Sequence, residues 1–211
     1  MGHRDSITVS HTNHYFKRLN VFVKDICFDK ENDQFYTVSN DRSMKVWNIR
    51  EMAYMDTHYG HHSDILSLDY YSKDRVVSSS LDRQCIFWKI DEDSELLYNS
   101  FNHTVDSIHV MTSQFFYTTS SDNAVDLWIM NKKKPIYSLE GLHKPDSWIL
   151  SSANVRDSDL FATGSYDGQV VCYGFNRDKK KFGVQGRIKG LEGCINNLKF
   201  SNHRAADLLG K

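Results

Sequence analysis

Hydrophobic and polar residues alternate in short runs along most of this chain, as in Ile65-Leu66-Ser67-Leu68 and Ser107-Ile108-His109-Val110. A two-residue period is typical of β-strands that bury one face. Val, Ile, Thr, Tyr and Phe fill these runs, and the chain has only 2 prolines and 11 glycines. Stretches with the period of an amphipathic helix are absent. The pattern therefore predicts an all-β chain.

One longer pattern recurs four times: an apolar strand, a turn at an Asp, and a second strand that ends in a large aromatic residue. The aromatic residue lies six positions after the Asp in every copy, in the pairs Asp41/Trp47, Asp82/Trp88, Asp122/Trp128 and Asp167/Tyr173. Hydroxyl residues stand two and four positions before each Asp, and successive Asp residues are 41, 40 and 45 positions apart. Because Asp favours tight turns, each copy predicts a β-hairpin.

Two further strands complete each unit. A histidine precedes three of the hairpins, at His61, His103 and His143, and an apolar run follows it. Another turn and a fourth strand come after the aromatic residue, as in Pro135-Ile136-Tyr137-Ser138-Leu139. Four strands per unit at a period of about 40 residues describe the blades of a β-propeller. We place these blades at residues 1–57, 58–100, 101–140 and 141–189.

The histidine near the start of each unit and the tryptophan near its end resemble the WD40-repeat family. Two departures are visible: no unit contains the Trp-Asp dipeptide, and the fourth has Tyr173 in place of Trp and Leu142 in place of the Gly before its histidine. The resemblance implies an all-β, WD40-type propeller of seven blades. We expect this chain to be a fragment of one, with four blades, the first strand of a fifth at 190–200 and an irregular tail at 201–211. A closed four-bladed ring is the alternative.

The WD40 resemblance also implies a buried, hydrogen-bonded set of His, hydroxyl, Asp and aromatic side chains in each blade. The implied sets are Thr37, Asp41 and Trp47; His61, Ser78, Asp82 and Trp88; His103, Thr118, Asp122 and Trp128; and His143, Thr163, Asp167 and Tyr173. The hydroxyls two positions before each Asp remain alternatives. A Ser–His–Asp triad would ordinarily occur once, whereas this set recurs, so we expect a packing device. No other catalytic motif is present, and we predict no enzymatic activity.

Composition adds limits to this picture. The net charge of −1 gives no overall attraction to nucleic acid, so any basic site must be local. No apolar run approaches the roughly 18 residues of a membrane-spanning helix, and the N-terminus lacks a secretory signal. Because the four cysteines are widely spaced, we expect free, buried thiols in a reducing compartment, no metal site and no cofactor. They are Cys27, Cys85, Cys172 and Cys194.

A more specific resemblance rests on the order of several stretches, which are residues 41–48, 161–165 and 195–201 and the dipeptide Trp148-Ile149. They are similar to the WD40 subunits of the U3 small nucleolar ribonucleoprotein. That family implies a scaffold which binds U3 small nucleolar RNA and the core proteins of its particle. It also implies a role in pre-ribosomal RNA processing and small-subunit ribosome biogenesis in the nucleolus of the nucleus. The family implies neither a membrane nor a small-molecule substrate.

The alternative function is a generic WD40 protein-binding adaptor, such as a ubiquitin-ligase receptor or a chromatin-complex subunit. The fold alone does not separate it from the scaffold role.

Blade topology assigns the candidate binding residues to two faces. The third-to-fourth turns carry Lys132, Lys133, Lys134, Lys179, Lys180 and Lys181 beside an acidic turn at 91–95. We expect these lysines to contact RNA phosphates, with solvated turns as the alternative. The opposite face carries the candidate protein contacts Arg42, Arg83, Trp148 and Tyr166, although Trp148 could instead pack between blades. An insertion around residues 10–19 is a further candidate contact or an unused loop.

Overall fold

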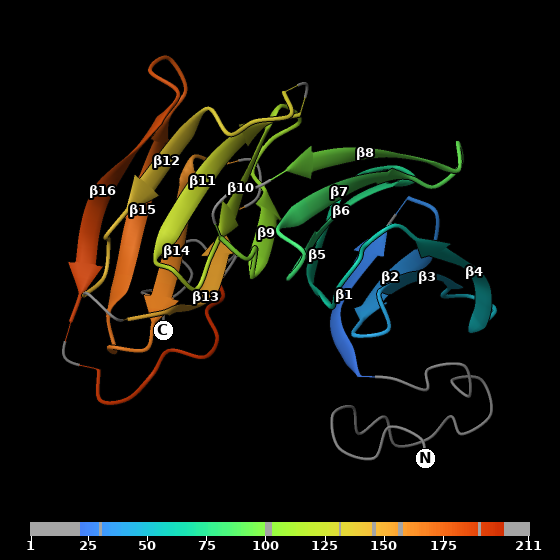
Figure 1. The fold of residues 1–211 in the computed structure, drawn as a ribbon, viewed down its shortest axis with the longest axis horizontal. Coiled ribbons are helices and arrows are strands. Elements are labelled where there is room, and N and C mark those ends of the chain that lie inside the picture. The colour runs from blue at the N-terminus through green and yellow to red at the C-terminus, as the bar shows by residue number, and fades with distance from the viewer. Residues whose placement is uncertain are drawn as a thin grey trace, which may run out of the picture.

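A computed structural model describes residues 22–29, 31–99, 103–130, 132–144, 147–155, 158–189 and 191–200. These residues form 16 strands in four separate four-stranded antiparallel sheets (Figure 1). Every sheet takes its strands in chain order, so each is a simple meander. The described residues contain no helix that could cross a lipid bilayer. The prediction of an all-β propeller architecture is confirmed.

The sheets are called blades 1 to 4 in chain order. Blades 1 and 2 contain β1 (Val23–Asp29), β2 (Gln34–Ser39), β3 (Ser43–Asn48), β4 (Ala53–Tyr59), β5 (Ile65–Ser72), β6 (Arg75–Ser80), β7 (Gln84–Lys89) and β8 (Ser94–Asn99). Blades 3 and 4 contain β9 (Ser107–Val110), β10 (Phe115–Thr119), β11 (Ala124–Ile129), β12 (Tyr137–Glu140), β13 (Ile149–Asn154), β14 (Leu160–Ser165), β15 (Val170–Asn176) and β16 (Lys181–Ile188). Strand β4 runs past the expected border at residue 57, because its last residue pairs with Ser43.

The turn between the second and third strands has the same backbone shape in all four blades. The residue after the Asp adopts a positive φ of 68° at Arg42, 66° at Arg83, 63° at Asn123 and 73° at Gly168. This left-handed conformation is easy for glycine and costs other residues about 1 kcal/mol. A repeated Asp therefore fixes four equivalent turns on one end of the blades.

Hydrophobic cores lie between neighbouring blades. Tyr36 and Val46 of blade 1 face Val76 and Trp88 of blade 2 in one buried cluster. Similar clusters join blade 2 to blade 3 and blade 3 to blade 4. Because side chains alternate along a strand, each blade offers one apolar face to the preceding blade and the other to the next.

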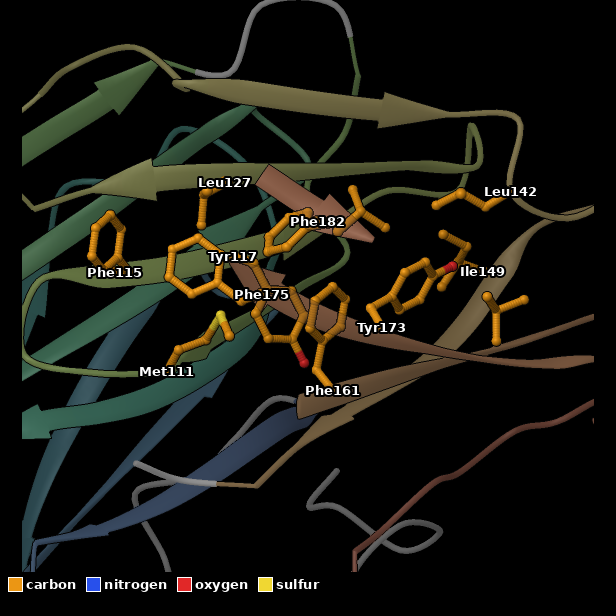
Figure 2. Packing of buried hydrophobic residues seen from close by; sticks show 12 residues of the cluster. Met111, Phe115, Tyr117, Leu127, Leu142, Ile149, Phe161, Tyr173, Phe175 and Phe182 are labelled. Atoms are coloured by element: carbon orange, nitrogen blue, oxygen red, sulfur yellow. The ribbon is translucent and has the colours of Figure 1, made fainter. Parts of the chain in front are cut away.

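Figure 2 shows the cluster between blades 3 and 4. The rings of Tyr117 and Phe161 stack with their centroids 4.3 Å apart, and Phe182 meets Phe161 edge-on at 4.7 Å. Phe182 comes from the outer strand β16, so this core extends to the rim of blade 4. Each such side chain stabilises the packing by about 2 kcal/mol through burial.

Polar side chains join the first strands of successive blades, which lie next to one another. The Asp25 carboxylate on β1 accepts hydrogen bonds from the Ser67 hydroxyl at 3.0 Å and the Leu68 backbone N–H at 2.8 Å on β5. One blade further on, Asp69 accepts the backbone N–H of Val110 at 2.7 Å. These contacts hold blades 1 to 3 at fixed relative positions.

Replacing Asp25 by alanine should lower the free energy of unfolding by about 1–2 kcal/mol, since two donors of blade 2 would lose their acceptor. Chemical denaturation of the full chain measures this change. The matched control is Lys24→Ala, because Lys24 is exposed on the same strand and its loss should change stability by less than about 0.5 kcal/mol. Equal effects of the two substitutions would contradict the proposed link between the blades.

One expectation is not met in the C-terminal segment 191–200. The predicted first strand of a fifth blade is not formed there. A strand needs a partner strand, whereas the described contacts of this segment lead back to blade 4: Ile195 N–H donates to the Ser165 carbonyl at 3.1 Å, and Ser151 donates to the Ile195 carbonyl at 2.7 Å. The expected tail at 201–211 lies outside the described residues.

The expectation that all cysteines are buried is also wrong. All four thiols are free, but only Cys27 and Cys85 are buried, while Cys172 is half-buried and Cys194 is exposed. Cys194 lies in the segment 191–200, which belongs to none of the four sheets. Burial raises the pKa of Cys85 well above its ordinary value, so this thiol stays neutral.

Candidate functional site

The complete polar set lies in blade 2. The Trp88 indole N–H donates to the Ser78 hydroxyl at 2.8 Å, and that hydroxyl lies 2.8 Å from His61 Nε2. The other ring nitrogen, Nδ1, lies 2.9 Å from Asp82 Oδ2. Because a carboxylate only accepts hydrogen bonds, Nδ1 carries the proton and Nε2 accepts from Ser78. The set forms one directed chain from Trp88 to Asp82 and ties the loop before β5 to the β6–β7 turn.

Blade 3 contains two separate halves of this set. His103 Nδ1 lies 2.7 Å from Asp122, and the Trp128 indole donates to Thr118 at 3.0 Å. No hydrogen bond joins His103 to Thr118 in the described part of the chain. The Asp122 side chain is 59% exposed, so this blade leaves a carboxylate at the surface.

Blade 4 has the hydroxyl links but a longer ion pair. His143 Nε2 lies 2.9 Å from Thr163 Oγ1, which lies 3.1 Å from the Tyr173 hydroxyl. The distance from His143 Nδ1 to Asp167 is 3.7 Å, beyond a hydrogen bond. Burial lowers the pKa of His143, which favours its neutral form.

Blade 1 has the hydrogen bond between the aromatic residue and the hydroxyl four positions before the Asp. The Trp47 indole donates to Thr37 at 2.9 Å, while Asp41 bonds its own turn through Ser39 and Ser43. Residues before Phe22, including the insertion at 10–19, lie outside the described residues.

The two hydroxyl positions before each Asp have different roles in the structure. The residue four positions before the Asp contacts the buried aromatic N–H or O–H in every blade. The serine two positions before it bonds the Asp backbone N–H in blades 1, 2 and 4, at Ser39, Ser80 and Ser165. Both hydroxyl positions are therefore used: the residue four positions before the Asp binds the aromatic side chain, and the serine two positions before it stabilises the turn.

The blade 2 set is closed to substrates. The side chain of His61 is 0% exposed and that of Asp82 only 7%. Burial alone would raise the pKa of Asp82, but hydrogen bonds from His61 and from the backbone of His62 and Gln84 lower it. An ionised Asp82 held by these donors stabilises a turn, and no substrate can reach the Ser78 hydroxyl, which is fully buried. Among the described residues, no cluster of His, Cys, Asp or Glu is suited to a metal ion.

Asn123 joins two blades in a way that the sequence pattern did not predict. Its amide donates to the His143 carbonyl at 3.1 Å and accepts the His143 N–H at 3.1 Å. This paired contact fastens the turn of blade 3 to the loop that leads into blade 4. The available signal was an Asn in a left-handed turn position, a conformation that Asn adopts more easily than most residues.

The Asp-turn face is the end of the blades that carries turns 40–42, 81–83, 121–123 and 166–168. Arg42 and Arg83 are exposed there at equivalent positions of neighbouring blades. Trp148 and Tyr166 are 59% and 62% exposed, with ring centroids 6.2 Å apart. The structure therefore places Trp148 at the surface rather than between blades.

The lysine face is the opposite end of the blades, with turns 132–134 and 177–180. All six candidate lysines are exposed there. Lys181 Nζ lies 5.7 Å above the ring centroid of Tyr137, three residues after Lys134, which is within cation–π distance. This contact joins the first residues of β12 and β16, each of which follows the basic turn of its blade. The nearby acidic turn of blade 2 is partly neutralised, because Glu92 pairs with Lys89 at 2.8 Å and with Arg75 at 3.4 Å.

Comparison with known families agrees with this architecture. The family profile described as "WD domain, G-beta repeat" matches residues 2–48, 53–89 and 133–173. Among solved structures, the crystal structure of the RRP9 WD40 repeats has a TM-score of 0.79 and 32% identity, covering 85% of this chain and 57% of that chain. The structure of U3-55K has a TM-score of 0.78 and 31% identity over the same shares.

Several curated proteins are similar in sequence. A WD repeat-containing protein of Schizosaccharomyces pombe is 28% identical over 94% of this chain and 45% of its own length. A U3 snoRNP-associated protein-like protein of Arabidopsis thaliana is 26% identical over 85% of this chain and 40% of its own length. The U3 small nucleolar RNA-interacting protein 2 of Mus musculus is 32% identical over 56% of this chain and 26% of its own length. The chain thus spans less than half the length of these relatives.

Proposed function

This chain belongs to the WD40-repeat family, and we propose that it is a non-enzymatic scaffold subunit of a U3 small nucleolar ribonucleoprotein. Its 32% identity to the RRP9 WD40 repeats over 85% of the chain is the observation that carries the proposal. Relatives whose names place them in the U3 particle point the same way. The proposed role places the chain in the nucleolus, in pre-ribosomal RNA processing.

The lysine face provides the surface for RNA in this proposal. Lys133 and Lys180 are exposed in the third-to-fourth turns of neighbouring blades, and Lys181 of blade 4 lies over the Tyr137 ring of blade 3. Phosphate contacts supply much of the affinity of proteins for nucleic acids. A net charge of −1 gives no general attraction to RNA, so a local basic surface of this kind is required.

Reversing charge at Lys133 and Lys180 together, with K133E and K180E, should weaken binding to U3 small nucleolar RNA by about tenfold and flatten its salt dependence. Each lost phosphate contact lowers the slope of log affinity against log salt by about 0.7–0.9. Filter binding at several salt concentrations measures both quantities. The control is Lys24→Glu, because Lys24 is exposed near the start of β1, at the Asp-turn end of blade 1 and away from the lysine face. Unchanged affinity of the double variant would remove the RNA role of this face.

The generic protein-binding adaptor is the second candidate function. Arg42 and Arg83 favour it, since arginine is common among the residues that anchor protein interfaces. Leu81, which is exposed beside Arg83, adds apolar surface. Purification of the chain with its bound RNA separates the two functions: co-purified U3 RNA supports the scaffold, and its absence supports the adaptor.

A further inference from the structure

The outermost strand of blade 4, β16, differs in charge from the outer strands of the other three blades. Strands β4, β8 and β12 each contain one carboxylate, at Asp56, Glu95 and Glu140, and no lysine or arginine. Strand β16 contains Lys181 and Arg187 and no carboxylate. Charges on neighbouring strands attract when opposite and repel when alike. An acidic strand would therefore be repelled by the first three edges and attracted by β16.

The outer edge of β16 is unpaired. This strand is the last of its sheet, and its described backbone partners all lie on β15 (Figure 1). It has 8 residues, more than β4, β8 or β12, and of these only Phe182 is buried. The described segment 191–200 bonds instead to Ser165 on β14 and Ser151 on β13. The N–H and C=O groups of β16 that point away from β15 are thus open to another strand.

Two glycines leave part of this strand without side chains. Neither Gly183 nor Gly186 has a positive φ, and a methyl group on either would meet no described atom within 4 Å beyond the adjoining residues. Backbone conformation and packing among the described residues therefore do not call for glycine here, although glycine weakens a strand. A glycine in a strand often marks the close approach of another backbone. Large side chains of an added strand can cover such positions.

The positive charge of β16 is concentrated at the end that adjoins the lysine face. Residues 179–181 are three exposed lysines, and Asp178 is the exposed carboxylate of the same turn. Arg177 does not add to this excess, because it pairs with Asp159 at 2.7 Å. Three lysines against one carboxylate leave this end electropositive, so it attracts acidic residues of a partner.

The opposite end of the strand is nearly neutral. Arg187 lies on β16 and Lys189 follows the strand, and both are exposed. Glu140 at the same end of β12 and Glu192 in the C-terminal segment are exposed as well and offset these two cations. An added strand is therefore favoured in one orientation, with its acidic end beside residues 179–181.

We propose that β16 binds an extended peptide of a partner protein, which joins blade 4 as a fifth strand with its acidic end beside residues 179–181. Backbone hydrogen bonds supply the contact, as is usual for strand addition to an open sheet edge. Alternate side chains of the peptide cover Gly183 and Gly186. This inference goes beyond the proposed RNA role, because it concerns the side of blade 4 and a protein partner. Single-stranded RNA bound along the same strand is the competing outcome.

Hydrogen–deuterium exchange of the full chain tests the proposal, because strand addition protects backbone N–H groups and a contact between charges alone does not. The probe is a synthetic peptide of about ten residues, the length of a long strand, with aspartates at one end and alternating threonine and phenylalanine after them. It should slow the exchange of amides within residues 183–188 and leave β4, β8 and β12 unchanged. A control peptide with proline in place of threonine lacks those donors and should bind at least about tenfold more weakly.

A proline in β16 itself gives the matching test on the chain. Gln185 lies at the bulge of β16 and has no partner in the pairing register with β15, and proline is tolerated at bulges of edge strands. Gln185→Pro should bind the acidic peptide at least about tenfold more weakly, whereas the control Gln185→Ala should bind it like the parent. Thermal unfolding checks that the variant folds. Should it not fold, the proline peptide gives the answer on the parent chain.

Three results would overturn the proposal: no protection of β16 at saturating peptide, equal binding of the proline peptide, or the same protection produced by an oligouridylate. The last result would assign this edge to RNA. A peptide with lysines in place of the aspartates should bind about tenfold more weakly, because it meets like charge at residues 179–181. Equal binding of the acidic and basic peptides would show that the lysines do not select the partner.

Discussion

Replacing Ser78 by alanine is expected to lower the free energy of unfolding by about 3 kcal/mol. The Ser78 hydroxyl accepts the Trp88 indole N–H at 2.8 Å and donates to His61 Nε2 at 2.8 Å. All three side chains are buried, so the substitution leaves two polar groups without a partner and without water. Each such group costs about 1–3 kcal/mol. Urea denaturation of the full chain measures the change.

The neighbouring serine offers a matched control. Ser79 is as buried as Ser78, but its hydroxyl has no hydrogen-bond partner among the described residues. Ser79→Ala should therefore be neutral or slightly stabilising. Ser78→Thr should keep most of the stability, because blades 1, 3 and 4 have threonine at this position. A loss for Ser79→Ala equal to that for Ser78→Ala would show that side-chain volume rather than hydrogen bonding holds the blade together.

Lowering the pH from about 6.5 to about 4 is expected to destabilise the fold by about 2–3 kcal/mol through His109 alone. This residue lies on β9, with its ring 5.3 Å from that of Tyr117. Burial lowers the pKa of His109 from its ordinary 6.5 to about 4, although the nearby Asp25 acts in the opposite direction. Between about pH 6.5 and pH 4, His109 is therefore protonated in the unfolded chain but stays neutral in the folded chain. Stability rises with pH wherever the unfolded state binds more protons, so it falls across this window on acidification.

Thermal unfolding followed at pH 7, 6, 5 and 4 measures this dependence, and His109→Gln is the informative variant. It removes the titrating ring and should flatten the profile between about pH 4 and 6.5. The Asp82 carboxylate acts in a different window: its lowered pKa provides stability that is present above the ordinary Asp range and is lost only at lower pH. A parent and a variant with the same slope between pH 4 and 6.5 would exclude His109 as the cause.

The sequence was sufficient for the repeating part of the fold, because that part depends on local chemistry. A strand that ends at an Asp and returns to an aromatic residue after six positions specifies a hairpin wherever it occurs. Four copies such as 76–88 and 116–128 therefore predicted four equivalent sheets. The exposed turns at 132–134 and 177–180 followed from the same register, because counting strands assigns each turn to one end of a blade.

Contacts between residues far apart in the sequence were decided only in three dimensions. The bonds of Asp25 to β5, and those of Asn123 to the His143 backbone, join segments of different blades, and no local pattern encodes them. The exposure of Trp148 likewise depends on what neighbouring blades leave uncovered. The strand expected at 190–200 is absent from the described residues 191–200 for the same reason. Alternating residues give a strand its buried face, but only the tertiary structure provides a partner strand. The sequence thus determined the blades, and packing between blades determined which side chains face solvent, a partner or each other.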